Sequence, residues 1–512
     1  MNPKPITAPF TLFATLPFLV VPWLNPFTSG PNASVLPFLV AWACTSGVFL
    51  WWSVLPQTPR QRLQTIALAW LVAASVNAVL GLLQYFDVSA SWTLWVNQPG
   101  AGQAFGNLRQ RNQFASLCTM GLAALGWWWM DSSGLDAQWK IPKRLAAAVL
   151  ALVLLAAVAA SGSRTGVLQL VVLSALGQCW LRPVVGPAPG KGWQALRLAA
   201  PLLLYLLAAW VLPKLAGIEH GALDRWPESS AQCNSRLNLW RNVLYLIAQK
   251  PLWGWGWGEL GYAHFITLYD APWAGLRFCE LLDNAHNLPL HLAVELGVPV
   301  ALILCGAVLV WVWRRQPLQE QRPERQLAWA VLAVIGVHSL LEYPLWYAQF
   351  QVAALGCVWA LCAFADETAA RDALASRARS WGVPALVAGL LIGLACAFAG
   401  WNYWRVSQPY LPPEARAPQF REQSWAQLRQ VWLFSDQVDF AQLAVTPATP
   451  ANAAYMQALA TDLLHFSPEP MVVKKLLQSA QMQGHRMDVA FYALRLQAAY
   501  PNDYAEWVSQ RP

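Results

Sequence analysis

Long apolar blocks dominate this 512-residue sequence and constrain its fold more than any other feature. Each block is about 17 to 25 residues long, the length that a helix needs to cross roughly 30 Å of hydrocarbon. Because a backbone in lipid must satisfy its own hydrogen bonds, the pattern predicts an all-α polytopic membrane protein with about 11 transmembrane helices. The approximate bounds are 7–24, 35–55, 64–84, 113–130, 145–161, 165–181, 195–213, 288–313, 327–345, 347–365 and 382–404.

Charged residues make up only 12% of the chain, and their placement predicts its orientation. With the N-terminus inside, every short inner loop contains Lys or Arg, as the positive-inside rule requires. The net charge of +8 is therefore a topology signal, and we expect contact with membrane lipids and not with nucleic acid. The inner loops are 56–63, 131–144, 182–197, 314–326 and 366–381.

The same topology leaves a large loop and the C-terminal tail on the outer face. We expect residues 1–404 to form the membrane domain, with its large outer loop at 214–287. A Pro-rich linker at 405–420 precedes a small soluble helical domain at 421–512. Two short amphipathic segments in that domain meet at Gly484 and are similar to a tetratricopeptide-type hairpin.

The outer loop contains two further features. Cys233 and Cys279 lie in it, whereas the other seven of the nine cysteines lie in apolar blocks. An oxidising compartment would allow these two to pair, and two free thiols are the alternative. Apolar residues also recur at helical spacing from 237 to 247, which predicts an amphipathic helix on the membrane surface or over a cavity. These residues are Leu237, Trp240, Leu244 and Ile247.

Arginines on the outer face run against the positive-inside trend and are candidates for anion binding. In GNLRQRNQFA (106–115), Gln110, Arg111, Asn112 and Gln113 precede the fourth block. A guanidinium fork suits phosphate, and the amides suit sugar hydroxyls. The alternative is a hydrated loop end whose arginines reach lipid headgroups.

Two other outer segments place an arginine beside a turn. SGSRTG (161–166) flanks Arg164 with glycines, so that backbone N–H groups and a helix N-terminus can approach an anion. SRLNLWR (235–241) supplies Arg236. The alternatives are a tight turn between two spans and the solvated face of an amphipathic helix.

DNAHNLPLHLAVELG (283–297) places three titratable groups at the mouth of an apolar run. Asn287 can cap the helix, so His286 would lie just outside its start. His291 and Glu295 are four residues apart and share a helix face. Since imidazole can take a proton from a hydroxyl near neutral pH, we interpret His286 as the candidate general base and the other two as its support. Capping or packing histidines are the alternative.

HSLLEYPLWYAQF (338–350) bends the chain at a proline between two blocks. Glu342 and Tyr343 are candidates for binding donor or acceptor, and His338 for a supporting role; a helical turn that these groups stabilise is the alternative. No dinucleotide or phosphate-loop glycine motif occurs, and no Asp-x-Asp pair stands in an outer loop. We therefore expect no cofactor and a reaction that needs no metal.

These motifs, in this order, resemble the O-antigen ligase and polymerase superfamily. FGNLRQRNQFA and HSLLEYPLWYAQF are similar to segments of its protein-glycosylating branch, the bacterial O-oligosaccharyltransferases or pilin glycosylation ligases, and the likeness covers roughly residues 100–360. The resemblance implies a multi-pass enzyme of the bacterial inner membrane whose active site faces the periplasm. Such an enzyme transfers an oligosaccharide en bloc from undecaprenyl diphosphate to Ser or Thr hydroxyls of exported proteins such as type IV pilin.

The resemblance implies roles for His286, Arg164, Arg236, Gln110, Asn112, Gln113 and Tyr343, and the residue patterns add Arg111 and Glu342. His286 would be catalytic, and the donor diphosphate would be bound by arginines, namely Arg164, Arg236 and Arg111. The glycan or acceptor would be bound by Gln110, Asn112, Gln113, Glu342 and Tyr343. Two rival functions stay open: an O-antigen ligase that uses the lipopolysaccharide core as acceptor, and a non-enzymatic transporter of the lipid-linked glycan. A transporter predicts charges along a midplane pathway, whereas these charges cluster at one face.

Overall fold

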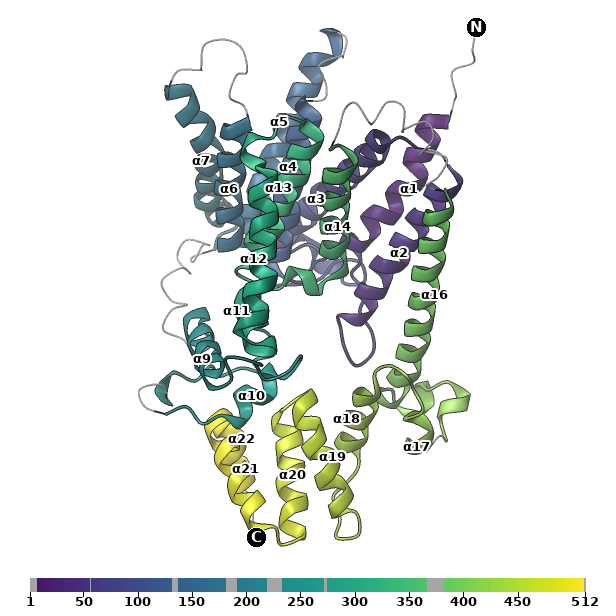
Figure 1. Cartoon of the computed structure of the whole chain (residues 1–512), viewed down its shortest axis with the longest axis vertical. Coiled ribbons are helices and arrows are strands. Elements are labelled where there is room, and N and C mark those ends of the chain that lie inside the picture. Colours follow the sequence, from purple (N-terminus) through teal and green to yellow (C-terminus); the bar gives the residue numbers. More distant parts are fainter. Residues whose placement is uncertain are drawn as a thin grey trace. The chain divides into compact units, whose positions relative to one another are not determined.

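The computed structural model describes residues 7–55, 57–130, 137–180, 191–218, 233–270, 274–365, 382–422 and 424–510. Within these ranges the chain forms helices and no strand, as the apolar blocks predict (Figure 1). The chain divides into two compact units. The first unit comprises Met1–Thr28, Ser34–Pro227 and Trp311–Ala397, and the second comprises Ser29–Ala33, Glu228–Val310 and Phe398–Pro512.

The first unit is built from the apolar helices. They are α1 (Thr7–Leu24), α2 (Val35–Val54), α3 (Pro59–Tyr85), α4 (Arg111–Met130), α5 (Ala137–Ser161), α6 (Arg164–Trp180), α7 (Lys191–Leu215), α13 (Pro323–Ser339), α14 (Ala348–Ala363) and the first part of α16 (Gly382–Ser407). Short 3-10 turns connect some of them, at η1 (Val88–Ser91), η3 (Pro317–Gln319) and η4 (Pro344–Trp346).

Helices α3 and α4 pack closely at the centre of the first unit because glycines line their contact. A Cβ atom on Gly121 would lie 2.5 Å from that of Ala74, and one on Gly81 would lie 2.4 Å from the ring of Phe114. Small residues at helix contacts are the usual means of close approach between membrane helices. Helices α5 and α13 also pack on this pair, so α4 is surrounded and its start is fixed in position.

Six described helices are long and apolar enough to cross a bilayer, so the chain is a multi-pass membrane protein. They span Val35–Val54, Pro59–Tyr85, Ile141–Ser161, Leu198–Ala216, Val298–Gln319 and Gly382–Tyr410, and Ala14–Leu24 and Ala348–Ala363 are shorter apolar helices. The total of about 11 spans stays a prediction.

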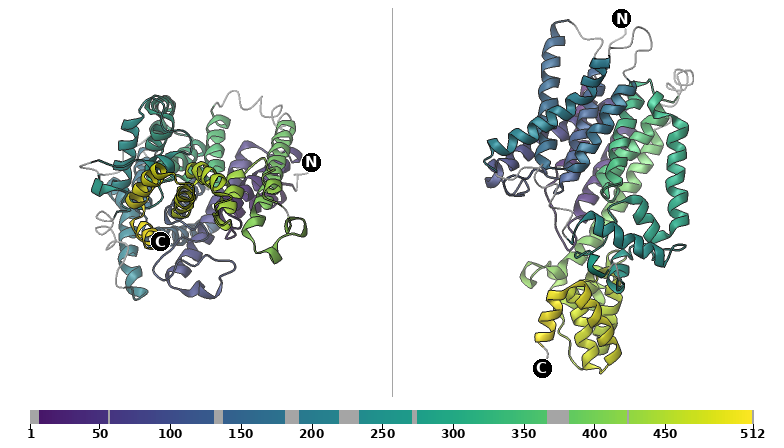
Figure 2. Two further views of the ribbon diagram at one scale, coloured as in Figure 1. Left: turned by 90° about the horizontal axis from the view of Figure 1, so that it is seen from below. Right: turned by 90° about the vertical axis from the view of Figure 1, so that its left-hand side faces the viewer.

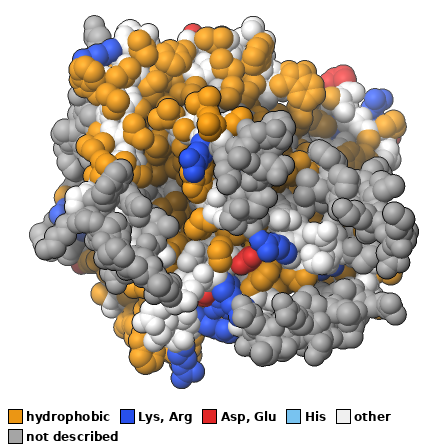
Figure 3. Space-filling model, turned by 90° about the horizontal axis from the view of Figure 1, so that it is seen from above, with side chains coloured by type: hydrophobic (Ala, Val, Ile, Leu, Met, Phe, Trp, Pro, Cys, Tyr) orange, Lys and Arg blue, Asp and Glu red, His pale blue; other side chains and the backbone are white. Residues whose placement is uncertain are grey.

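Broad apolar exposure agrees with a lipid environment. On the face drawn in Figure 3, hydrophobic side chains cover wide areas, and Lys and Arg side chains lie between them. On α12 (Val298–Arg315), Leu302 and Ile303 expose 68% and 70% of their surface. Apolar patches of this extent are rare on soluble monomers, because water disfavours them.

The second unit combines the outer loop with the tail. Its helices are α9 (Arg236–Gln249), α10 (Leu260–Ile266), α11 (Leu288–Leu296), the start of α12, the end of α16, α17 (Trp425–Leu428), α18 (Ser435–Val445), α19 (Ala453–Phe466), α20 (Pro470–Met482), α21 (Arg486–Ala499) and α22 (Pro501–Ser509), with 3-10 turns η2 (Ala274–Leu276), η5 (Gln408–Tyr410), η6 (Pro413–Ala415) and η7 (Pro418–Phe420). Helices α19 to α22 follow one another as packed neighbours (Figure 2).

Loop and tail share a hydrophobic core in this unit. Phe265 of α10 is buried among Met456 and Leu464 of α19 and Leu476 of α20. The ring of Tyr262 also stacks on His465, with centroids 3.9 Å apart. The tail therefore supports the outer loop. The likeness of the tail to a tetratricopeptide hairpin stays a prediction.

The apolar block 288–313, which the sequence predicts as one span, forms two helices. Helix α11 ends at Leu296, α12 begins at Val298, and the candidate span starts at that residue. Gly297 between them has φ +88°, a backbone conformation that favours glycine. A Cβ atom there would lie 2.1 Å from the carbonyl oxygen of Leu252, because the loop after α9 runs directly against this break.

Backbone hydrogen bonds hold that loop against the end of α11. The N–H groups of Trp255 and Gly256 donate to the carbonyls of Val294 (2.8 Å) and Glu295 (3.0 Å). Carbonyls at a helix C-terminus need such partners. The alternating Trp and Gly residues of WGWGWG thus serve a close backbone contact with α11.

Candidate functional site

Two buried amides of α3 hold the segment that precedes α4. The Asn77 Oδ1 accepts a hydrogen bond from the N–H of Asn107 (3.0 Å), and the Gln84 Oε1 accepts one from the N–H of Gly106 (2.8 Å). Gly106 has φ +57°, and a Cβ atom on it would lie 2.4 Å from Asn77 Oδ1. The FGN motif is therefore fixed to α3, and the polar residues that follow it start from a rigid position.

The first turn of α4 presents an arginine beside a capped helix start. The Gln110 Oε1 accepts from the N–H of Gln113 at 2.7 Å, which satisfies one of the N–H groups that a helix start leaves open. Arg111 is the first residue of α4 and is exposed, whereas Gln113 is buried. A cation beside helix N–H groups suits an anion.

The SGSRTG segment is a tight turn that starts α6. Gly162 has φ +62°, and the Ser163 Oγ accepts from the N–H of Gly166 at 3.1 Å. Gly166 packs so closely that a Cβ atom on it would lie 2.9 Å from Ala115 of α4. Arg164, the first residue of α6, is exposed. The glycines thus serve the turn and the helix packing, and Arg164 is left at the helix N-terminus.

Asn112 connects the three polar segments of the first unit. Its Nδ2 donates to Glu342 Oε1 at 2.8 Å, and its Oδ1 accepts from Ser163 Oγ at 2.6 Å. Glu342 is buried, with 4% of its surface exposed. A buried carboxylate needs such partners, so this network fixes the turn after α13 relative to the starts of α4 and α6.

A second part of the network lies one turn deeper. The Ser116 Oγ lies 2.9 Å from His338 Nδ1 and accepts from Gln169 Nε2 at 2.7 Å. Gln169 Nε2 also donates to the carbonyl of Val334 at 3.0 Å. His338, Gln169 and Ser116 are buried, so His338 serves to join α4, α6 and α13.

Tyr343 lies in the turn that Glu342 anchors. Its ring stacks on that of Tyr347, with centroids 5.9 Å apart and planes at 17°. Trp346 meets it edge-on at 6.4 Å. The side chain of Tyr343 is half-buried in this aromatic group. Aromatic faces of this kind can stack on the apolar face of a sugar ring or on an acceptor side chain.

In the second unit, His286 lies at a constrained corner before α11. Its backbone has φ +49°, a region that few non-glycine residues occupy. Asn284 and Asn287 hold the corner: Asn284 Oδ1 accepts from the N–H of His286 at 2.9 Å, and Asn287 Oδ1 caps α11 by accepting from Leu290 N–H at 3.0 Å. The His286 side chain is half-buried, and its position agrees with the sequence expectation that it lies just outside the helix start.

His291 and Glu295 form a buried pair within α11. Their Nε2 and Oε2 atoms are 3.4 Å apart, and the side chains are only 3% and 1% exposed. Helix α11 lies outside the six candidate spans. Burial, and after it the charge of His286, lower the pKa of His291 to about 4. Burial raises the pKa of Glu295 to about 7, although backbone N–H groups of Gly258 and Leu260 oppose it. The pair thus favours a neutral imidazole beside a protonated carboxyl.

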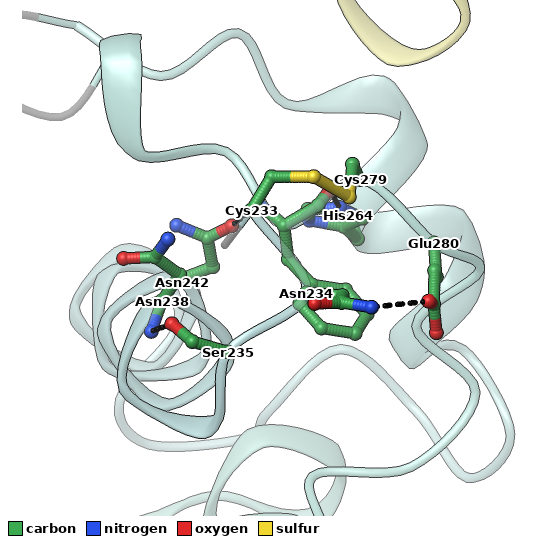
Figure 4. Close-up of a disulfide and its surroundings, with 9 residues drawn as sticks. Cys233, Asn234, Ser235, Asn238, Asn242, His264, Cys279 and Glu280 are labelled. Carbon is green, nitrogen blue, oxygen red and sulfur yellow. Dashed lines mark hydrogen bonds between the residues drawn. A yellow bond between two sulfur atoms is a disulfide. The ribbon is translucent and has the colours of Figure 1, made fainter. Parts of the chain in front are cut away.

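Arg236 begins α9. The disulfide of Cys233, three residues earlier in the chain, is drawn in Figure 4. Ser235 caps this helix by accepting from the N–H of Asn238 at 3.3 Å. Cys233 and Cys279, whose pairing the sequence left open, are joined, which ties the start of α9 to the segment before His286. Asn234 Nδ2 adds a hydrogen bond to Glu280 Oε1 at 2.9 Å.

The predicted residues thus form one group in each unit. The first unit brings together Gln110, Arg111, Asn112, Gln113, Arg164, His338, Glu342 and Tyr343, and the second contains Arg236, His286, His291, Glu295 and the two cysteines. Sequence reasoning missed five buried polar residues that hold the first group, Asn77, Gln84, Ser116, Ser163 and Gln169. Three of these residues could have been identified from the sequence, because each is a side-chain amide inside an apolar block. They are Asn77, Gln84 and Gln169.

Three family models match the chain. "O-Antigen ligase" matches residues 146–305, "Protein glycosylation ligase" matches 104–129, and "Virulence factor membrane-bound polymerase, C-terminal" matches 326–512. These ranges contain the arginine and histidine motifs, the polar start of α4, and the tail, respectively.

Two similar curated proteins come from Acinetobacter baylyi. A general O-oligosaccharyltransferase is 26% identical over 182 residues, which cover 35% of this chain and 30% of that protein. A ComP-specific O-oligosaccharyltransferase is 30% identical over 119 residues, which cover 23% of this chain and 21% of that protein. The matched part is therefore less than a third of either relative. No solved structure matches the chain.

Proposed function

The chain belongs to the O-antigen ligase superfamily, in its protein-glycosylating branch, and on this premise we propose that it is a glycosyltransferase with a protein acceptor. Its donor is an oligosaccharide on undecaprenyl diphosphate, which it transfers en bloc to Ser or Thr hydroxyls of an exported protein such as type IV pilin. The reaction takes place at the periplasmic face of the bacterial inner membrane. The two named relatives and the match of the α4 segment to the protein glycosylation ligase family support a protein acceptor.

The conformation of His286 is the observation that carries this proposal. A histidine with φ +49° stores strain, which is about 1–3 kcal/mol at such positions, and strained positions of this kind cluster at functional sites. Two asparagine side chains hold that corner in place through hydrogen bonds to backbone N–H groups. We expect a strained, half-buried histidine at a position where its imidazole takes part in the reaction.

The proposed reaction is a displacement at the anomeric carbon. His286 takes the proton of the acceptor hydroxyl, and the hydroxyl oxygen forms a bond to that carbon. The bond from the carbon to the diphosphate oxygen breaks, and undecaprenyl diphosphate leaves with the electron pair. Arg164, Arg236 and Arg111 bind the diphosphate and stabilise its growing charge. One step inverts the anomeric centre, so a product with retained configuration would contradict this scheme.

Burial separates the roles of the remaining residues. We propose that Gln110 and Tyr343, which are half-buried, contact the glycan or acceptor. Gln113 and Glu342 are 2% and 4% exposed, so we assign neither a direct contact with substrate, and Glu342 acts by holding Asn112. His291 and Glu295 similarly support α11 behind His286.

We also propose that the reaction needs no metal, since arginines supply the positive charge. Transfer in excess EDTA should equal transfer in its absence.

Reconstitution of the purified chain with a lipid-linked oligosaccharide tests the proposal. Pilin and lipid A–core are offered as separate acceptors, and glycosylated pilin is the expected product. His286→Ala should abolish transfer, whereas His485→Ala, at the exposed start of α21, should leave it unchanged. Thermal unfolding of both variants shows that they fold. Transfer by folded His286→Ala would remove the base assignment, and transfer to lipid A–core alone would identify an O-antigen ligase.

The transporter alternative has its own readout. Movement of a lipid-linked glycan across a vesicle membrane, without any glycosylated acceptor, would support it. The proposed enzyme instead consumes the donor only when an acceptor is present.

A further inference from the structure

The first unit contains an apolar cavity that the proposed reaction does not use. It has a volume of about 230 Å³ and lies between α1, α2, α3 and α14. Aromatic and aliphatic side chains form most of its wall, including Phe18, Trp42, Phe49, Trp70 and Trp359. Among the described residues of the lining, Arg62 is the one that carries a charge. An apolar cavity of this kind suits a hydrocarbon chain, and its single cation needs an explanation.

Among the residues that the structure describes, Arg62 is buried without an anionic partner. The residue is 8% exposed, its Nε has no hydrogen-bond partner among the described residues, and its guanidinium carbon lies 5.0 Å from the ring centre of Trp52. The indole Nε1 of Trp52 is also buried without an acceptor. A guanidinium stays charged in proteins, and a buried charge without a counter-ion is strongly disfavoured. Two adjacent donors without acceptors therefore indicate that an anionic oxygen belongs at this end of the cavity.

The dimensions of the cavity match one leaflet of a bilayer. Along α14 its lining runs from Gln349 to Trp359, ten residues or about 15 Å, which is half of the ~30 Å hydrocarbon thickness. Trp359 lies at the Arg62 end, because its ring is 6.5 Å from that of Trp52. A cation at one end of an apolar slot of this length fits a single lipid.

The position of Arg62 separates this lipid from the donor. Arg62 lies in the first turn of α3, and Tyr85 ends that helix, about 35 Å away at 1.5 Å per residue. The carbonyl of Tyr85 accepts from Gly102 N–H, so the segment that leads to Arg111 starts at that far end. The cavity therefore serves the leaflet opposite the candidate site for the diphosphate.

We propose that this cavity binds one anionic phospholipid. Its phosphate accepts hydrogen bonds from Arg62 and Trp52, and one acyl chain lies in the slot between α1, α2, α3 and α14. The proposal does not depend on glycosyl transfer. It concerns a lipid that stabilises the packing of the N-terminal helices on α14.

The first experiment tests whether the site prefers a negatively charged lipid. It measures the binding of defined lipids to the delipidated full chain in detergent. Phosphatidylglycerol should bind about tenfold more tightly than phosphatidylcholine by native mass spectrometry, because both lipids carry the phosphate but the choline ammonium places a second cation near Arg62. Arg62→Gln should remove that preference. Arg60→Gln is the matched control, since Arg60 is 56% exposed near Glu324 and should keep it. Equal binding of the two lipids by the unmodified chain, or an unchanged preference in Arg62→Gln, would overturn the proposal.

A second variant tests the acyl slot and does not touch the arginine. Gly356 of α14 lines the cavity, and a Cβ atom on it would meet nothing within 4 Å. Gly356→Leu should therefore fold, fill the slot and weaken phosphatidylglycerol binding about tenfold. Unchanged binding in this variant would contradict an acyl chain in the slot. Inorganic phosphate should not displace the lipid at equal concentration; displacement would show a site for the anion alone and overturn the lipid assignment.

Discussion

The side-chain amide of Asn112 donates a 2.8 Å hydrogen bond to Glu342, a residue 230 positions later in the chain. The same amide accepts from Ser163, which caps the helix that begins with Arg164. One asparagine thus couples the starts of α4 and α6 to the turn that contains Tyr343. The Asn112 side chain donates one of these hydrogen bonds and accepts the other. Neither an acidic nor an aliphatic side chain can therefore replace both.

We expect Asn112→Asp to damage this coupling severely. The substitution exchanges a donor for a second carboxylate beside the buried Glu342, which should lower the free energy of unfolding by about 2–4 kcal/mol. Thermal unfolding in detergent measures this loss. Glu342→Gln, combined with Asn112→Asp, supplies a donor to the new carboxylate and should recover part of it. A double variant that is no more stable than Asn112→Asp would show that the pair is not coupled.

Each end of this coupling could be predicted from the sequence, but the pairing could not. Asn112, Arg164 and Glu342 stand out because polar residues bordering apolar blocks are costly. Which of them meet depends on how α4, α6 and α13 pack, and helical periodicity carries no information on that. The amides Asn77 and Gln84 lie inside an apolar block, yet the loop backbone that they bind could not be identified without the fold.

The break at Gly297 shows a different limit. The block 288–313 is apolar apart from His291 and Glu295, so its composition predicts one continuous span. The loop that ends α11 comes from about 40 residues earlier and contacts it through backbone atoms, as between Gly254 and Glu295.

The sequence also predicted helix α9, but not which of its faces is buried. Leu239, Val243 and Leu246 form the buried face, whereas Leu237 and Leu244 are exposed. Both faces are apolar, so the spacing could not distinguish them.

The glycine at the break gives a prediction for stability. Gly297→Ala places a Cβ atom 2.1 Å from a backbone oxygen at φ +88° and should reduce the free energy of unfolding by about 2–4 kcal/mol. Gly306→Ala, in the interior of α12 where a Cβ meets nothing within 4 Å, is the control. It should be neutral or stabilising by up to about 1 kcal/mol. Similar melting temperatures for the two variants would contradict the close contact with Leu252.

The disulfide gives a redox-dependent prediction. Cys233 and Cys279 close a loop with a sequence separation of 46 residues, and chain entropy assigns such a bond on the order of 4 kcal/mol. Dithiothreitol should lower the melting temperature of the unmodified chain. The variant with Cys233→Ser and Cys279→Ser should melt at that lower temperature with or without the reductant. Cys305→Ser, which removes a free thiol of α12, should behave like the unmodified chain.

The buried pair of α11 gives a prediction for pH, in which the two residues act with opposite sign. The pKa of His291 is lowered in the folded state, so its contribution to stability is lost as pH falls from about 6.5 to about 4. The pKa of Glu295 is raised, so its contribution is lost as pH rises from about 4.5 to about 7. Between these limits the two slopes oppose each other, and the unmodified chain should show a nearly flat contribution from this pair.

Single substitutions should expose the two slopes. In Glu295→Gln only the titration of His291 remains. The melting temperature should therefore rise between pH 4.5 and 6.5 relative to the unmodified chain. In His291→Asn only the titration of Glu295 remains, and the melting temperature should fall over the same pH range. Melting curves of both variants at several pH values measure these trends against the unmodified chain. Parallel pH profiles for the two variants would contradict a neutral imidazole beside a protonated carboxyl in the folded state, because that arrangement requires slopes of opposite sign.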